Sequence, residues 1–188
     1  AISTSNLPGY DQGIKNTNGS LGVAIVDGVN DNRIADNGGY SIEAAYSLEL
    51  SEGLNGFLGA RLNSQDGAED TSVYNMYVTY ETGAWLFAAE VAQFNGATGA
   101  EDATDYQVMA NYSYSDTASI TLRYATNELD TLDATNAVET PAGSAITVAH
   151  NLALADNLAL IAELTSFEPD AAGADDVLGG AVELLFTF

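Results

Sequence analysis

The C-terminal stretch 177–188 (VLGGAVELLFTF) constrains the fold more than any other part of this chain. Every second residue, counted back from Phe188 and Phe186, is apolar or glycine, while the intervening positions include Glu183 and Thr187. A repeat of two residues is that of a β-strand, whose side chains point alternately to opposite faces. The stretch is therefore expected to form a strand with one apolar face.

The same alternation recurs along the whole chain and predicts an all-β fold of about ten to twelve strands. At 188 residues the sequence fits one domain, residues 1–188, in which the N-terminal segment 1–19 holds one weaker candidate strand around residues 12–16. The three prolines, Pro8, Pro141 and Pro169, lie outside the other expected strands, as a sheet requires. These strands are expected at 20–28, 39–50, 55–64, 71–81, 84–95, 103–115, 118–128, 144–154, 158–167 and 177–188.

One face of each expected strand is apolar, and the other carries polar or small residues. A soluble β-sandwich would turn the apolar face toward a core and the polar face toward water. A membrane barrel has the opposite arrangement, with the apolar face in contact with lipid. The alternation alone is compatible with both folds.

The lengths of the connections favour the barrel. Short turns alternate with long acidic loops, so the turns gather at one end of the strands and the loops at the other, as in bacterial outer-membrane barrels. The sequence therefore predicts a transmembrane antiparallel up-and-down β-barrel. The short turns are expected at 51–53, 82–83, 115–117 and 155–157, and the long loops at 27–38, 63–70, 95–104, 127–143 and 168–176.

Aromatic residues support the membrane interpretation through their positions on the apolar face. An amphipathic ring is best placed where hydrocarbon meets water, so two rows of aromatics are expected at the two membrane interfaces. Tyr40, Tyr74 and Tyr106 fall near the long-loop end. The girdle at the short-turn end is predicted to contain Tyr46, Tyr80, Trp85, Tyr112, Tyr114, Phe186 and Phe188.

Composition excludes several other classes of protein. The net charge of −23, with 27 acidic residues against four basic ones, argues against nucleic-acid binding. Cysteine is absent, which excludes a disulfide framework. No window approaches the roughly 20 apolar residues of a membrane helix. The first residues, AISTSNLPGY, do not resemble a signal peptide, so we expect a processed chain or one whose beginning is missing.

The polar face carries the candidate functional residues, because it is expected to line the interior of the barrel. Charged side chains there can set a transverse field that orders water and permeating ions. The alternative is a structural ion-pair network that fills a narrow barrel. Many small residues on the same face favour open, water-filled space. The lumen-facing candidates are Glu43, Arg61, Glu90, Arg123, Glu163 and Glu183.

The long loops hold most of the acidic residues and predict a negative mouth that concentrates cations. We therefore expect the channel to prefer cations. Carboxylates of this density are also candidate ligands for Ca²⁺, although neither dense segment matches an EF-hand loop and a solvated acidic loop is the simpler interpretation. The candidate Ca²⁺ ligands are Asp27, Asp31, Glu101, Asp102 and Asp105.

Nothing in the sequence predicts an enzyme. His150 is the single histidine, and it falls in phase with Ile146, Val148 and Leu152 on the apolar face. A catalytic nucleophile needs a neighbouring base, and no such constellation is evident. His150 is a candidate for a subunit contact.

Several stretches resemble the OmpL-like family of outer-membrane β-barrel porins. They are SLGVAIVDGVND (20–31), SVYNMYVTYETGAWLFAAEVAQF (72–94), DYQVMANYSYSDTASITLRYAT (105–126) and NLALIAELTSFEPD (157–170), together with the final strand, which resembles the closing strand of bacterial outer-membrane barrels. The resemblance implies a channel for small hydrophilic solutes in the outer membrane, insertion by the barrel assembly machinery through the C-terminal strand, and a homotrimer or other homo-oligomer. Members of the family are longer, and this chain resembles their C-terminal half.

Two other functions remain open from the sequence. The first is a narrow, non-conducting outer-membrane barrel that acts as an anchor, adhesin or partner-binding scaffold. The second is a secreted acidic β-sandwich or lectin, which would be soluble without detergent and would need neither a terminal phenylalanine nor aromatic girdles.

Overall fold

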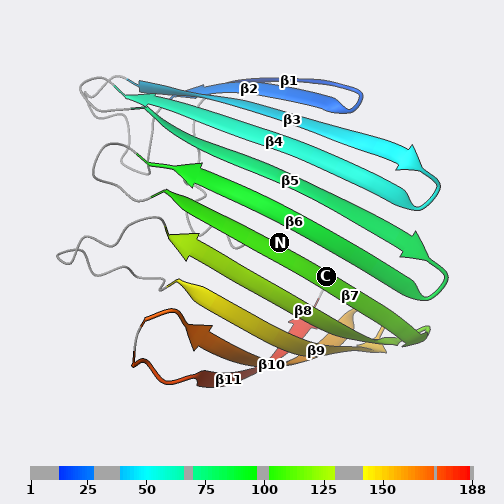
Figure 1. The fold of residues 1–188 in the computed structure, drawn as a ribbon. Helices are drawn as coiled ribbons and strands as arrows, with labels where there is room; N and C mark the ends of the chain where they lie inside the picture. The colour runs from blue at the N-terminus through cyan, green and yellow to red at the C-terminus, as the bar shows by residue number, and fades with distance from the viewer. Residues whose placement is uncertain are drawn as a thin grey trace.

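The computed structural model describes residues 13–27, 39–65, 70–96, 102–129, 142–171 and 173–186, which form one antiparallel sheet of eleven strands (Figure 1). No helix over these residues is long and apolar enough to span a membrane. The strands are β1 (Gly13–Asn18), β2 (Leu21–Asp27), β3 (Gly39–Ser51), β4 (Leu54–Gln65), β5 (Thr71–Thr82), β6 (Trp85–Asn95), β7 (Ala103–Ser115), β8 (Ala118–Leu129), β9 (Gly143–Ala155), β10 (Leu158–Pro169) and β11 (Val177–Phe186).

The expected all-β, up-and-down architecture is confirmed. Every strand expected from the alternation is present within a few residues, and the weaker candidate at residues 12–16 is the real strand β1. One detail of the expectation was wrong, because β10 includes Pro169 as its last residue, opposite Gly143. Proline is tolerated at the end of a strand, where its missing N–H interrupts few ladder hydrogen bonds.

The strands follow one another in chain order, each paired with the strands before and after it. The short turns lie together at one side of the sheet in Figure 1. Strict up-and-down order means that all odd-numbered strands run toward the short turns, so β1 and β11 run in the same direction. Within the described residues β1 and β11 do not pair, so the sheet curls but is not closed.

Burial across the sheet is the reverse of that in a soluble domain. The large apolar side chains are exposed, including Met76, Val108 and Leu122 at 52–55 % of their surface. Among the described residues, the buried polar side chains are Ser41 and Thr147, at 0 % and 3 %. Soluble proteins bury their apolar side chains preferentially. The exposed apolar face therefore matches a sheet whose outer face contacts lipid, and it does not match a β-sandwich.

Three β-bulges interrupt the register, each beside a short turn. They leave Leu50, Tyr114 and Leu154 without a directly opposite residue in the neighbouring strand. A bulge increases local twist and bends the strand that carries it. The bulges therefore lie where adjacent strands turn back at this end of the sheet.

Three of the short turns carry a glycine in the left-handed region, at Gly19 (φ +57°), Gly53 (φ +74°) and Gly83 (φ +58°). A Cβ built on Gly53 would lie 2.4 Å from the carbonyl oxygen of Glu81, whereas a Cβ on Gly83 would meet nothing within 4 Å. The backbone of Glu81 also donates a hydrogen bond to the carbonyl of Gly53 at 2.8 Å. The β3–β4 turn is thus packed closely against the end of β5.

This difference makes a matched pair of substitutions informative. Both Gly53→Ala and Gly83→Ala should lose about 1–2 kcal/mol of folding free energy, because alanine disfavours a positive φ. Gly53→Ala should lose about 1–3 kcal/mol more, because its methyl group collides with backbone. Urea unfolding of the lipid-reconstituted protein, followed by fluorescence of the single tryptophan, Trp85, measures both. Equal losses would show that the turn is not packed as described.

Candidate functional site

The polar face of the sheet is the candidate functional surface. The register places Glu43, Arg61 and Glu90 on the same face of the sheet, and it places Arg123 there as well. Glu163 and Glu183 follow on β10 and β11 through the pairs Glu163↔Ala181 and Ile161↔Glu183. All the predicted lumen-facing residues therefore share one face. The role of these six residues in a channel stays a prediction.

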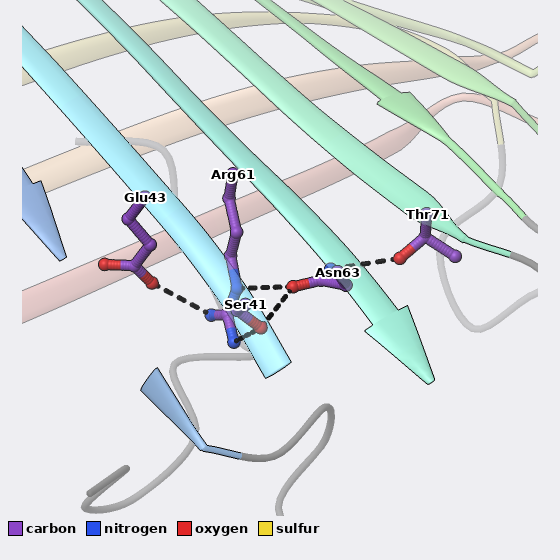
Figure 2. Close-up of polar contacts among 5 residues, drawn as sticks. All are labelled: Ser41, Glu43, Arg61, Asn63 and Thr71. Carbon is purple, nitrogen blue, oxygen red and sulfur yellow. Dashed lines mark hydrogen bonds and ion pairs between the residues drawn. The ribbon is translucent and has the colours of Figure 1, made fainter. Parts of the chain in front are cut away.

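The largest hydrogen-bonded group on this face, which we call the Arg61 cluster, lies toward the long-loop ends of β3, β4 and β5 (Figure 2). Arg61 lies 3.5 Å from a carboxylate oxygen of Glu43, and its Nε donates to Asn63 Oδ1 at 2.8 Å. Ser41 donates to the same Asn63 oxygen at 2.7 Å, and Asn63 donates to Thr71 at 3.0 Å. The guanidinium is thereby held against the wall by Glu43 of β3 and by Asn63 of its own strand, and Asn63 is in turn bonded to Thr71 of β5.

Arg123, the other described arginine on the polar face, has a different environment. Its guanidinium donates to Thr147 Oγ1 at 3.3 Å, and the hydroxyl of Thr147 lies 2.9 Å from that of Thr165. Thr165 in turn donates to a carboxylate oxygen of Glu163 at 3.4 Å. Arg123 and Glu163 are therefore linked through two threonines and form no direct ion pair. Sequence reasoning placed both residues on this face but could not predict the connecting hydroxyl groups.

Three residues of the polar face carry acceptors that are poorly supplied with donors. Glu90, in the middle of β6, accepts a hydrogen bond from Asn75 at 2.6 Å and has no ion pair within the described part of the chain. Nearer the long-loop end, Asp105 of β7 and Asn127 of β8 face each other, and one side-chain oxygen of each is buried without a hydrogen-bond partner. Buried acceptors without donors are costly. A group that donates hydrogen bonds is therefore favoured at this place.

An aromatic pair on the polar face was missed by the sequence analysis. Phe57 and Tyr77 lie opposite each other on β4 and β5, with ring centroids 4.8 Å apart and ring planes 10° from parallel. Both residues are out of phase with the apolar faces of their strands, whose members include Leu58 and Met76. That phase is the signal in the sequence that distinguishes them from girdle aromatics.

The acidic-loop candidates are only partly covered by the structure. Asp31, Glu101 and the side chain of Asp27 lie outside the described residues. Asp102 accepts a hydrogen bond from the backbone of Gly96 at 2.8 Å, and Asp105 lies on β7 facing Asn127. Over the described ranges, no group of three or more acidic or histidine side chains is arranged to hold a metal ion. The expected Ca²⁺ site stays a prediction for the loops.

The aromatic residues near the short turns lie on the exposed, apolar face. Trp85 packs against Tyr112 with ring centroids 4.6 Å apart, and Tyr114 is 53 % exposed. Tyr46, Tyr80 and Phe186 are also exposed, while Phe188 lies outside the described residues. These positions are those expected of an interfacial girdle.

His150 lies on the apolar face, in register between Ile120 and Ala162. Its Nε2 is 2.5 Å from the hydroxyl of Tyr114, the residue at the bulge in β7. The contact passes over β8, where Ala118 is small and buried. A polar group that faces lipid needs a hydrogen-bond partner, and Tyr114 provides one for His150.

Comparison with known proteins identifies the fold. No family model and no curated protein matches this chain, so the resemblance to the OmpL-like family stays a prediction. Among solved structures, the NanC porin matches with a TM-score of 0.56 and 8 % identity over 94 % of this chain and 91 % of its own. Another porin matches with a TM-score of 0.61 and 15 % identity, and an anion-selective porin from Comamonas acidovorans with 0.60 and 15 %.

The lengths of the matches differ among these structures. This chain covers 60 % of the second porin and 52 % of the anion-selective porin, and those matches include 93 % and 88 % of this chain. At such low identities the likeness defines the fold alone. The sheet described here is therefore a porin-type β-barrel sheet.

An arginine placed on each face tests which face contacts lipid. Val108→Arg, on the exposed apolar face near the middle of β7, should destabilise the reconstituted protein by about 2–4 kcal/mol, because charge at the bilayer midplane is costly. Ala88→Arg, on the polar face of β6, should cost much less, because the polar face is solvated. Urea midpoints in lipid vesicles measure both variants. A larger loss for Ala88→Arg would contradict the assignment of the two faces.

Proposed function

We propose that this chain forms the wall of an outer-membrane porin, through which small hydrophilic solutes and ions diffuse passively. The observation that carries the proposal is the reversed burial pattern, in which polar side chains are half-buried and large apolar side chains are exposed. A porin has this arrangement because its outer face contacts lipid and its inner face contacts water. The fold shared with solved porins supports the same conclusion.

The side chains of the polar face favour an open lumen over a filled interior. Small residues alternate with the charged ones, which leaves space that only water or a permeating solute can occupy without the cost of a dry cavity. A narrow scaffold would need larger side chains or more ion pairs to fill the same volume. The small residues on this face include Gly22, Ala45, Ala88, Ala92, Ala125 and Ala149.

The charges on the wall support a preference for cations. Among the described residues, the Arg61 guanidinium is balanced by Glu43, and the other basic residues on this face are Arg123 and, on the edge strand β1, Lys15. The carboxyl groups of Glu90, Asp105 and Glu163 lie on the same face and supply negative charge. With a net charge of −23 for the whole chain, the field along the pore is expected to be negative.

The orientation in the membrane follows from the connections. The short turns would face the periplasm, and the long loops would face outside, as in bacterial barrels. We propose that the C-terminal strand is the segment by which the barrel assembly machinery inserts the protein, and that the porin forms a homo-oligomer such as a trimer.

Reversal potentials across a planar bilayer test the proposed channel and its preference. With a tenfold KCl gradient, the wild-type protein should show discrete conductance steps and a cation-to-anion permeability ratio of roughly 3–10, because the wall charge is negative. Glu163→Gln should lower this ratio and Arg123→Gln should raise it, since the two substitutions remove opposite charges from linked positions. Conductance steps with a reversal potential close to the equilibrium potential of chloride would refute the cation preference. Silence from correctly folded protein would refute the channel itself.

A further inference from the structure

Phe57 and Tyr77 form an aromatic pair on the polar face of the sheet. Phe57 and Tyr77 are stacked with centroids 4.8 Å apart, and Tyr77 retains 37 % of its surface exposed. Large apolar rings on a wet wall lose the favourable burial that rings obtain in a core or at a membrane interface. Their presence in the middle of a polar row therefore calls for a reason other than barrel closure or membrane anchoring.

A glycine on the same strand makes room for the pair. A Cβ built on Gly59 would lie 2.9 Å from Cε1 of Phe57, so the ring of Phe57 extends over Gly59 along β4. The absence of a side chain at Gly59 therefore leaves room for the ring of Phe57, which stacks on Tyr77 to form one aromatic surface.

The neighbouring strand adds a carboxylate to this surface. Glu90 lies directly opposite Tyr77 in the register, and Gln107 lies opposite Glu90 on the following strand. Asn75 donates to Glu90 Oε1 at 2.6 Å, which orients the carboxylate without neutralising it. Within the described residues no arginine or lysine forms an ion pair with Glu90. Phe57, Tyr77, Glu90, Asn75 and Gln107 therefore form one continuous row, which we call the aromatic–carboxylate row.

We propose that the aromatic–carboxylate row is a binding site for organic cations of the quaternary ammonium class. The faces of aromatic rings attract cations through their quadrupole, and the effect is largest for weakly hydrated ammonium groups. The carboxylate of Glu90 supplies the opposite charge. A hard metal ion would need several oxygen ligands, and no such group is present among the described residues. The proposal rests on the channel function and adds to it a class of solute that the wall selects.

The charge of Glu90 separates an organic cation from a neutral solute at this row. A neutral sugar would gain contact with the rings and hydrogen bonds to the carboxylate, whereas an organic cation would gain the rings and the opposite charge of Glu90.

Two measurements on the folded protein test the proposal. The first is the bi-ionic reversal potential of the channel with choline on one side and sodium on the other, together with the block of sodium current by tetramethylammonium. The second is titration of detergent-folded protein with tetramethylammonium, followed by NMR of the ligand, which needs no channel activity. If the channel conducts no current but the titration shows saturable binding that depends on Tyr77, the porin proposal fails while the binding site stands.

The expected results separate the ring from the charge. Tyr77→Leu and Glu90→Gln should each weaken tetramethylammonium binding by about threefold to tenfold. Tyr77→Phe should retain binding, because it keeps the ring face, and it also guards against a folding defect in the leucine variant. Glu163→Gln, which removes a carboxylate elsewhere on the wall, should leave binding within about twofold of wild type.

Two outcomes would overturn the proposal. If Tyr77→Leu, shown to be folded by its gel mobility before and after heating, binds tetramethylammonium as wild type does, the aromatic pair only covers Gly59. If glucose competes with tetramethylammonium and its binding shows the same loss in Tyr77→Leu but none in Glu90→Gln, the row binds sugars.

Discussion

Hydrogen bonding of the backbone within the sheet is the interaction on which the rest of this structure depends. In hydrocarbon no water can satisfy an exposed amide or carbonyl group, so a chain must pair these groups internally. The eleven-strand meander does so between its two edges by pairing each strand with the next in the chain, while the outer edges of β1 and β11 are not paired with each other within the described residues. Since the pairing uses only backbone groups, the side chains are free to differ completely between the two faces.

That freedom explains how a chain of neutral mean hydropathy can form one sheet with an apolar face and a polar face. Alternation places Val108 in one environment and Gln107 in the other, one residue apart. The apolar face is mainly aliphatic, with most of its aromatic rings toward its ends and Tyr124 opposite Val108 in the middle. The polar face varies in character, from the balanced Arg61 cluster near the long loops to the acceptor-rich region around Glu90. The specificity of such a wall depends on which charges remain unbalanced.

The alternation of apolar and polar residues was sufficient to predict the strands and the face on which each charged residue lies. Neighbouring residues of a strand point to opposite faces, and the two faces differ in the burial of their side chains. Contacts between strands depend on register, and register depends on turns and bulges that single residues do not reveal. The hydrogen bonds of Ser41 and Arg61 with Asn63 require the pairing Ile42↔Leu62, which the bulge at Leu50 helps to set. The contact of Tyr114 with His150 crosses a whole strand and lies beside another bulge.

The phase of an aromatic residue proved more informative than its type. Tyr77 and Tyr80 have the same chemistry and lie on the same strand, yet the difference of three positions puts them on opposite faces. A count of aromatics, or their general preference for strands, assigns both to the membrane interface. Only the parity of the position separates a residue of the wall from a residue of the girdle.

The shared direction of β1 and β11 has a geometric consequence for the seam of the barrel. If these two strands met directly, they would form a parallel pair in an otherwise antiparallel sheet. A second copy inserted in the same orientation would not change this, because its edge strands also run toward the short turns. An antiparallel seam instead requires an odd number of strands between β1 and β11. In the proposed porin, the circumference of the pore, and hence the size of the solute that passes, would therefore be fixed at this seam and not by the described strands alone.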